Sequence, residues 1–169
     1  MTESGTGTGF ISNGIILTAS HVVSGRNQIS VQIFNEVLNA KVLHEDRQRD
    51  IAVIKVEMNE YQSRLFGMLG NIPLGDSDKV EIGEDVVEIG NSLGLGITVS
   101  NGIISAFKNF KGEKRFQTTS PTSPGNSGSP LINSQDECIG IITSQIKEGQ
   151  NLNFAVPINY AKKLLNGGK

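Results

Sequence analysis

Residues 124–130 read Pro-Gly-Asn-Ser-Gly-Ser-Pro, so Ser127 lies between Gly125 and Gly128 in a segment with proline at both ends. A turn of this composition can lift a hydroxyl clear of its neighbours and aim backbone N–H groups at one point. A serine nucleophile with an oxyanion hole needs that arrangement. Clusters of Gly, Ser, Asn and Pro also form ordinary loops, so the function of this turn depends on the residues that precede it.

A histidine and an aspartate upstream of the turn have the chemistry that a serine nucleophile needs. His21 follows Leu-Thr-Ala-Ser at 17–20, and Asp50 opens the run Asp-Ile-Ala-Val-Ile-Lys-Val at 50–56. Each lies at the edge of an apolar, β-branched run, where a strand holds a side chain that still reaches a cleft. Asp46 competes for the same role but lacks the apolar strand that follows Asp50. The order His, Asp, Ser is that of chymotrypsin, whereas subtilisins have the order Asp, His, Ser.

Length and composition exclude several classes of protein. The chain has 169 residues, 15 basic and 17 acidic, with a formal net charge of −2. This length predicts one domain or two small, closely packed subdomains. No basic patch stands out and no apolar run is long enough to span a bilayer, so we expect neither nucleic acid binding nor membrane insertion.

The cysteine content and the first residues indicate in which cellular compartment the protein is expected. Cys138 is the single cysteine, which excludes an intrachain disulfide, and it opens a run that reads as a buried strand, so we interpret it as structural. Residues 1–5 do not resemble a secretory signal. Together these features favour an intracellular location, or a periplasmic one if a leader was removed.

Short β-rich runs recur between turn signals along the chain, and Asn13-Gly14 is typical of a two-residue hairpin turn. With no helix expected between them, these runs predict an all-β fold of barrels or a sandwich. The polar stretch 57–64, with Gly67, Gly70 and Pro73 after it, is the candidate linker between halves. One helix is expected, from residue 158 or 159, with Gly167 capping its end. The predicted strands are residues 9–11, 15–17, 28–34, 37–43, 51–56, 86–89, 97–107, 115–118, 130–132, 139–145 and 153–156.

In its motifs and their order the chain resembles the trypsin-like serine proteases, and more closely their HtrA/Deg branch. The matching segments are residues 7–11 (GTGFI), 16–23 (ILTASHVV), 50–55 (DIAVIK), 74–78 (LGDSD), 89–92 (IGNS), 98–105 (TVSNGIIS), 125–128 (GNSG) and 153–157 (NFAVP). The resemblance implies two packed six-stranded antiparallel β-barrels, a short C-terminal helix and an active site in the cleft between the barrels. The implied divisions are an N-terminal barrel at about 1–63, a connecting segment at 64–75, a C-terminal barrel at 76–157 and the helix at 158–166.

The resemblance also implies roles for individual residues. Ser127 would be the nucleophile, His21 the base that takes its proton, and Asp50 the carboxylate that orients the imidazole. The backbone at Gly125, Asn126 and Ser127 would form the oxyanion hole.

A polypeptide substrate would add as a β-strand along the edge formed by Thr143, Ser144 and Gln145. Thr122 and Ser123 would help to line the pocket for the side chain before the scissile bond. None of the matched pocket positions is charged. A small or medium aliphatic side chain is therefore expected there, because a charged one would lack a partner.

Several positions depart from the patterns of these proteases. Asn126 stands where trypsin-type zymogens have an aspartate that pairs with a newly cut N-terminus, so we expect no activation by N-terminal cleavage. Competence would depend instead on how the loop 120–126 is ordered. Ser123 and Ser129 replace the asparagine and glycine usual in the HtrA branch. We expect a protease domain without a PDZ domain, and the residues leave the oligomeric state and a fused or separate regulatory domain open.

The residues leave two other functions open. One is a catalytically silent relative that binds exposed peptide strands in the same cleft, and the other is an esterase. His44 lies in a charged segment and is interpreted as a surface residue. Asp76 and Asp78 do not have the spacing of a calcium loop, so we interpret them as turn residues and expect no metal and no cofactor.

Overall fold

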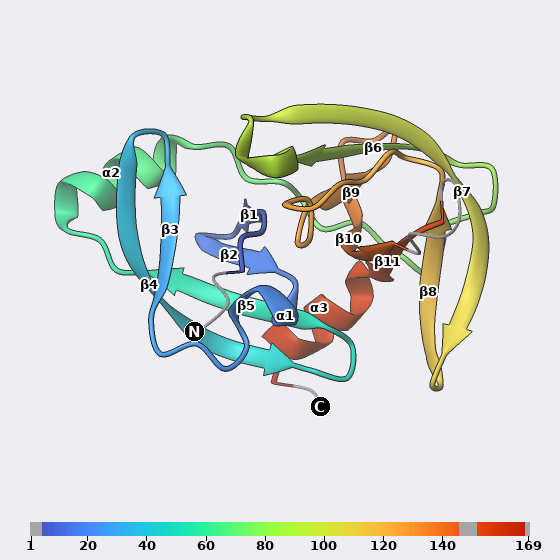
Figure 1. The fold of residues 1–169 in the computed structure, drawn as a ribbon, viewed down its shortest axis with the longest axis horizontal. Helices are drawn as coiled ribbons and strands as arrows, with labels where there is room; N and C mark the ends of the chain where they lie inside the picture. Colours follow the sequence, from blue (N-terminus) through green and yellow to red (C-terminus); the bar gives the residue numbers. More distant parts are fainter. Residues whose placement is uncertain (1–4, 146–151, 168–169) are drawn as a thin grey trace.

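The computed structural model describes residues 5–145 and 152–167 of the chain. Two antiparallel β-sheets lie side by side, one built from the N-terminal part of the chain and one from the C-terminal part (Figure 1). Strands dominate both halves. The all-β class predicted from the sequence is therefore confirmed.

The N-terminal sheet has five strands in the order β1-β2-β5-β4-β3. Asn13 and Gly14 join the first two strands, and their φ angles of 51° and 76° fit the predicted hairpin turn. Six strands were expected, but within the described ranges the edge strands β1 and β3 do not pair with each other, so the sheet stays open. The strands are β1 (Gly9–Ser12), β2 (Ile15–Thr18), β3 (Ile29–Ile33), β4 (Glu36–Asp46) and β5 (Ile51–Val56).

The C-terminal sheet closes into a six-stranded barrel in the order β10-β11-β8-β7-β6-β9. Side chains alternate along its strands, as in β6, where every second residue is buried. Closure leaves the barrel without the exposed edges of an open sheet. The strands are β6 (Asp85–Gly90), β7 (Thr98–Phe110), β8 (Glu113–Thr118), β9 (Pro130–Ile132), β10 (Cys138–Gln145) and β11 (Asn153–Pro157).

Helices occur at α1 (Ser20–Val23), α2 (Glu60–Met68) and α3 (Ile158–Leu165), with a 3₁₀ turn, η1 (Ser92–Gly94). The last one was predicted. The expectation of no helix between the strands is wrong at α1 and α2, and α2 occupies much of the expected linker. Asn59 and Gln62 form a reciprocal capping box at its start, with hydrogen bonds of 2.9 and 3.1 Å. None of the described helices is long and apolar enough to cross a membrane.

Apolar side chains pack in three clusters among the described residues. One belongs to the N-terminal sheet and one fills the C-terminal barrel. The third, which we call the shared core, joins the two halves and holds α3 against both. Its buried members are Phe10, Leu17, Ile51 and Val53 from the first half, and Cys138, Ile141, Val156, Ile158 and Ala161 from the second.

Candidate active site

His21 and Asp50 are brought together at one end of the N-terminal sheet. His21 lies in α1, directly after β2, and Asp50 lies directly before β5, which is the neighbour of β2. Nδ1 of His21 is 2.8 Å from Oδ2 of Asp50, and the backbone N–H of His21 donates to Oδ1 at 2.8 Å. Asp50 has a φ of 62°, a left-handed conformation that aspartate adopts more readily than most residues. Asp46 pairs with Arg49 instead, at 2.8 Å.

Asp50 changes the acid–base behaviour of the histidine. Its hydrogen bond raises the pKa of His21 above the ordinary value of 6.5, and partial burial of the ring opposes this rise. The side chain of His21 is 48% exposed, so it lies at the surface. Because Nδ1 is engaged by Asp50, Nε2 is the ring nitrogen left for a third group.

The segment before Asp50 is bound to the C-terminal barrel. Nε of Arg49 donates to one carboxylate oxygen of Glu113 at 3.0 Å, and Nε2 of Gln48 donates to the other at 3.0 Å. Nη2 of Arg115 donates to the carbonyl oxygen of Arg49 at 3.2 Å. Glu113 is buried, so water screens its pair with Arg49 less than it screens a surface pair. These contacts hold Asp50 in place relative to the barrel as well as to its own sheet.

Residues 123–126 form a tight turn just before Ser127. The N–H of Asn126 donates to the carbonyl oxygen of Ser123 at 3.0 Å, and Gly125 has a φ of 101°. This bond and this positive φ are the pattern of a type II turn, which favours proline followed by glycine. The N–H of Asn126, expected in the oxyanion hole, is thus used within the turn. Within the described part of the chain, the N–H groups of Gly125 and Ser127 have no hydrogen-bond partner.

Gly128 brings this turn against the N-terminal half. Its N–H donates to the carbonyl oxygen of Ile142 at 2.7 Å, and its φ is 92°. A Cβ atom on Gly128 would overlap the carbonyl oxygen of Thr8 and the hydroxyl oxygen of Thr18, and would lie 3.0 Å from the nitrogen of Ala19. Only glycine fits such a close approach at this φ. Because α1 follows Ala19 directly, the turn is in contact with the segment that leads into the histidine-bearing helix.

Thr8 fastens the same turn from the side of the N-terminal segment. Its N–H donates to the carbonyl oxygen of Ser127 at 2.8 Å, and its hydroxyl donates to that of Gly125 at 2.8 Å. The same hydroxyl accepts from the N–H of Asn91 at 3.1 Å, and the Thr18 hydroxyl donates to the Thr8 carbonyl oxygen at 2.6 Å. The hydroxyl of Ser127 makes no hydrogen bond to any described residue. The turn is therefore held by its backbone while its central hydroxyl stays available.

A buried carboxylate lies behind the turn. Glu88, on β6, is 1% exposed, and its two oxygens accept from Oγ1 of Thr122 and Nδ2 of Asn126, each at 2.6 Å. The hydroxyl of Ser92 donates to Oδ1 of Asn126 at 2.9 Å. Burial raises the pKa of Glu88 above its ordinary value of 4.5, and the hydrogen bonds from Thr122 and Asn126 oppose this rise. Sequence reasoning missed Glu88, although the alternation of β6 puts it on the inner face with Val86.

The residues predicted to pair with substrate lie at the end of β10. Thr143 is buried, and its hydroxyl is 3.5 Å from the carbonyl oxygen of Phe154. Ser144 and Gln145 pair with β11, and their side chains lie outside the described residues. On the opposite side of β10, β9 pairs as far as Ile141, and the backbone of the next residue, Ile142, is hydrogen-bonded to Gly128 and Ser129. Among the described residues, no strand pairs with the end of β10 on that side.

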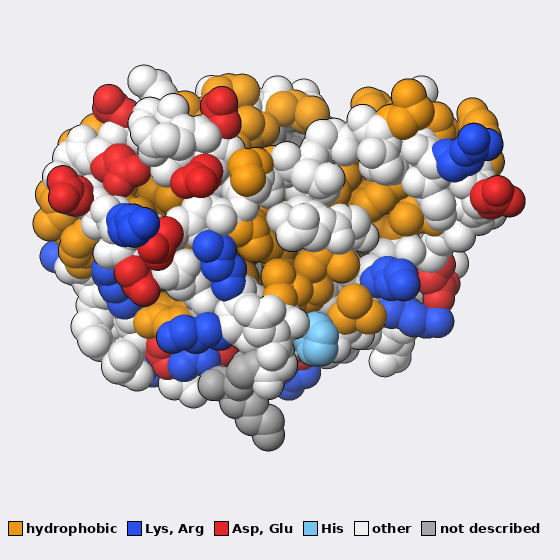
Figure 2. All heavy atoms as spheres, turned by 180° about the vertical axis from the view of Figure 1, so that it is seen from behind, with side chains coloured by type: hydrophobic (Ala, Val, Ile, Leu, Met, Phe, Trp, Pro, Cys, Tyr) orange, Lys and Arg blue, Asp and Glu red, His pale blue; other side chains and the backbone are white. Residues whose placement is uncertain are grey.

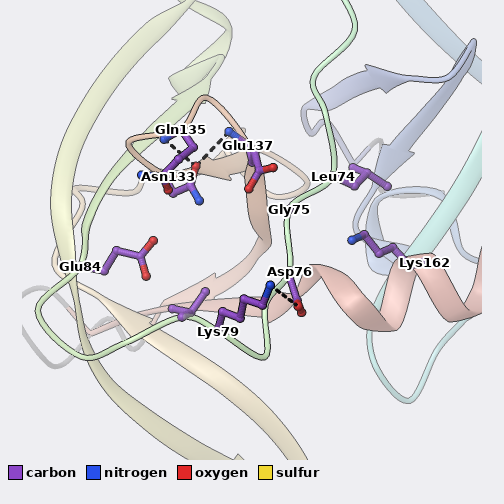
Figure 3. Close-up of a pocket in the computed structure, with 10 residues that line it drawn as sticks. Leu74, Gly75, Asp76, Lys79, Glu84, Asn133, Gln135, Glu137 and Lys162 are labelled. Carbon is purple, nitrogen blue, oxygen red and sulfur yellow. Dashed lines mark hydrogen bonds and ion pairs between the residues drawn. The ribbon is translucent and has the colours of Figure 1, made fainter.

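A polar cavity of about 330 Å³ lies apart from these residues (Figure 3). Asp76 and Lys79 line it with their side chains 3.7 Å apart, and Asp76 also accepts from the N–H of Asp78, as expected of a turn residue. Across the described residues, no group of three His, Cys, Asp or Glu is placed to hold a metal ion. On the face seen in Figure 2, acidic and basic side chains are interspersed, and apolar ones gather between the two halves. None of the predicted site residues lines the cavity, whose lining is Leu74, Gly75, Asp76, Lys79, Val80, Glu84, Asn133, Gln135, Glu137 and Lys162.

A protein family model and several named relatives match this chain. The family model described as "Trypsin-like peptidase domain" matches residues 5–141. A provisionally named serine protease, HhoB of Synechocystis sp., is 41% identical, over 99% of this chain and 42% of its own length. The "Periplasmic pH-dependent serine endoprotease DegQ" of Escherichia coli is 36% identical, over 95% of this chain and 36% of its own length. The chain thus spans less than half of these relatives.

The fold of this chain is also similar to that of a solved HtrA-type protease. The structure titled "HtrA-type protease AlgW with decapeptide" has a TM-score of 0.81 and 33% sequence identity. The match covers 96% of this chain and 52% of that one.

Proposed function

The chain belongs to the trypsin-like peptidase domain family, and we propose that it is a serine endopeptidase of the HtrA type. The observation that carries this proposal is the doubly hydrogen-bonded pair of His21 and Asp50. The turn that holds Ser127 packs against the segment leading into the helix of His21. A base, the carboxylate that orients it and a hydroxyl are the parts of a serine nucleophile system.

In the proposed reaction, Oγ of Ser127 attacks the carbonyl carbon of the scissile bond while Nε2 of His21 takes its proton. Asp50 accepts from Nδ1, which keeps Nε2 free to accept and stabilises the imidazolium. His21 then gives the proton to the leaving amine, and water hydrolyses the acyl-enzyme with the same nitrogen as base. The hydrogen bond from Ser127 to His21 is not formed among the described residues; in unliganded enzymes this bond is often long and tightens on binding.

Gly125 and Ser127 are the proposed oxyanion-hole donors. The turn before Ser127 consumes the N–H of Asn126 and leaves theirs without a described partner. Donors fixed in advance stabilise the charge that develops on the substrate oxygen, and each is worth roughly 10²–10³ in rate in other enzymes. The side chain of Asn126 is held by Glu88 and Ser92, which supports competence without a newly cut N-terminus.

The proposed substrate is an extended polypeptide. It would pair with the side of β10 that no described strand occupies beyond Ile142, whose own N–H and carbonyl oxygen are hydrogen-bonded to Ser129 and Gly128. Glu88 is an acid beside the proposed pocket residue Thr122, but it is 1% exposed and its oxygens already accept two hydrogen bonds. Glu88 therefore offers no free carboxylate to a basic substrate side chain, and we retain the preference for small or medium aliphatic residues.

The cellular compartment of the reaction is also a proposal. The name of the Escherichia coli relative places that protein in the periplasm, and we propose the same compartment here. Such names give no support to the intracellular location that the cysteine content favoured.

The second candidate is a catalytically silent module that binds peptide strands in the same cleft. The unformed hydrogen bond between Ser127 and His21 is the observation that favours it. A fluorophosphonate probe separates the two. Labelling of the wild-type chain that disappears in Ser127→Ala supports the peptidase, and no labelling at any pH from 6 to 9 refutes it. Cleavage of a peptide library then tests the aliphatic preference, which cuts after Lys or Arg would contradict.

A further inference from the structure

We propose that Glu88 is a positioning residue for residues 123–128, which we call the nucleophile turn, and that it holds this turn in place through Thr122 and Asn126. The inference rests on the proposed role of Ser127. Glu88 touches neither the substrate nor the reacting atoms. It acts through the two residues that flank the segment 123–125.

The contacts of Glu88 bracket the turn. One carboxylate oxygen accepts from Thr122, before the turn, and the other accepts from Asn126, directly before Ser127. Both hydrogen bonds are 2.6 Å long, which is short for hydrogen bonds in proteins. A single side chain therefore fixes both ends of the segment whose N–H groups must converge.

The strand that carries Glu88 is fixed by its pairing with two neighbours, whereas the turn has few hydrogen bonds of its own. Glu88 lies in the middle of β6 and is paired with Ser100 of β7 and with Leu131 of β9. The turn has a single internal backbone bond, from Asn126 to Ser123. Its geometry consequently depends on anchors outside the turn, which are the contacts with Thr8 described above and the side-chain contacts with Glu88.

The amide of Asn126 is held on both faces. Nδ2 donates to Glu88, while Oδ1 accepts from the hydroxyl of Ser92, which also lies 3.1 Å from that of Thr98. These contacts fix the amide orientation, so the side chain of Asn126 cannot turn without leaving a buried polar group unpaired.

Among the described residues, the groups that face Glu88 are uncharged. They are Thr122, Asn126 and Ser120, and burial acts on the carboxyl without a compensating cation. A protonated Glu88 can keep both contacts, because its carbonyl oxygen accepts from Asn126 and its O–H donates to the rotatable hydroxyl of Thr122. A glutamine can do the same with its amide. An alanine side chain makes neither contact. We therefore expect the turn to require the shape and the hydrogen bonds of this side chain, and not its charge.

The test compares Glu88→Ala with Glu88→Gln in the full chain. Hydrogen–deuterium exchange is followed over residues 120–129, with residues 104–118 as the internal reference, and the rate of fluorophosphonate labelling is measured in parallel. For Glu88→Ala we expect exchange in 120–129 to rise at least about tenfold and labelling to slow by a similar factor, as two lost hydrogen bonds imply. For Glu88→Gln we expect both to stay within about threefold of the wild type.

Unchanged exchange in Glu88→Ala would overturn the proposal, whatever happens to labelling. So would a Glu88→Gln variant that behaves like Glu88→Ala. If Glu88→Ala does not fold, Thr122→Val removes one anchor at a half-buried site, and unchanged exchange there would also overturn it. Exchange needs no activity, so a wild-type chain that the probe fails to label refutes the peptidase proposal while the exchange result still decides the role of Glu88.

Discussion

Replacing Gly128 with alanine would push the nucleophile turn away from the N-terminal half. The added methyl group overlaps the carbonyl oxygen of Thr8 and the hydroxyl of Thr18, and its nearest other neighbour is the backbone nitrogen of Ala19. Two of these three atoms belong to the backbone, so rotation of a side chain cannot relieve the overlap. The backbone must move at the point where the two halves of the site meet.

The cost has two parts. A non-glycine residue at a φ of 92° costs about 1–3 kcal/mol in backbone strain. Overpacking against fixed atoms adds about 1–3 kcal/mol. We therefore expect Gly128→Ala to lower the free energy of unfolding by about 2–6 kcal/mol, a large share of the 5–15 kcal/mol typical of a folded chain.

Gly83→Ala is the matched control, because Gly83 has a φ of 94° and a Cβ atom there would meet nothing within 4 Å. It isolates the backbone strain and should cost about 1–3 kcal/mol. Urea unfolding of both variants gives the difference, and fluorophosphonate labelling under native conditions should fall in Gly128→Ala alone. If Gly128→Ala is no more destabilised than Gly83→Ala and still labels at the wild-type rate, the close packing of the turn is refuted.

Four further outcomes follow from the site and its surroundings. Because Asp50 raises the pKa of His21, the acid limb of kcat/KM should have its midpoint above pH 6.5, and Asp50→Asn should move it down and reduce the rate; a limb below 6.5 in the wild type would contradict this. Folding raises the pKa of Glu88. The protonated carboxyl therefore stabilises the folded chain below pH 4.5, and this contribution is lost as pH rises through the folded-state pKa. Glu88→Gln should therefore unfold at higher urea than the wild type at pH 7 and at equal urea at pH 4, and equal midpoints at both would refute the buried charge. Burial raises the pKa of Cys138 to about 12, so iodoacetamide should alkylate it only after unfolding, as mass spectrometry would detect. Thr8→Val removes a hydroxyl that donates to one backbone oxygen and accepts from one N–H, and should slow labelling about tenfold, whereas Thr8→Ser should not.

The strands were predictable because alternation and turn residues are local signals. The run 51–56 and the hairpin at Asn13 appear in the structure as predicted. The helix α2 was missed although Asn59 and Gln62 carry the spacing of a capping box, because a polar, glycine-containing stretch was interpreted as a linker.

The site was predictable only in part. The contact between His21 and Asp50 follows from their places at the ends of adjacent strands and from a family resemblance. Glu88 could not be found in the same way, since it meets Thr122 and Asn126 only after the barrel closes and brings residues 34 and 38 positions apart into contact. Its one local signal is a charge at an inward position of β6.

The shared core couples the unfolding of the two halves. Phe10 and Leu17 from one sheet and Ile141 and Val156 from the other bury the same apolar surface. Pulling the halves apart would expose that surface to water, so unfolding should be a single all-or-none transition and not a stepwise loss of lobes. The proposed base, His21, and the proposed nucleophile, Ser127, come from the two halves that this cluster joins. Catalytic competence would then vanish at the same denaturant concentration as the fold itself, and turnover would serve as a direct reporter of global unfolding.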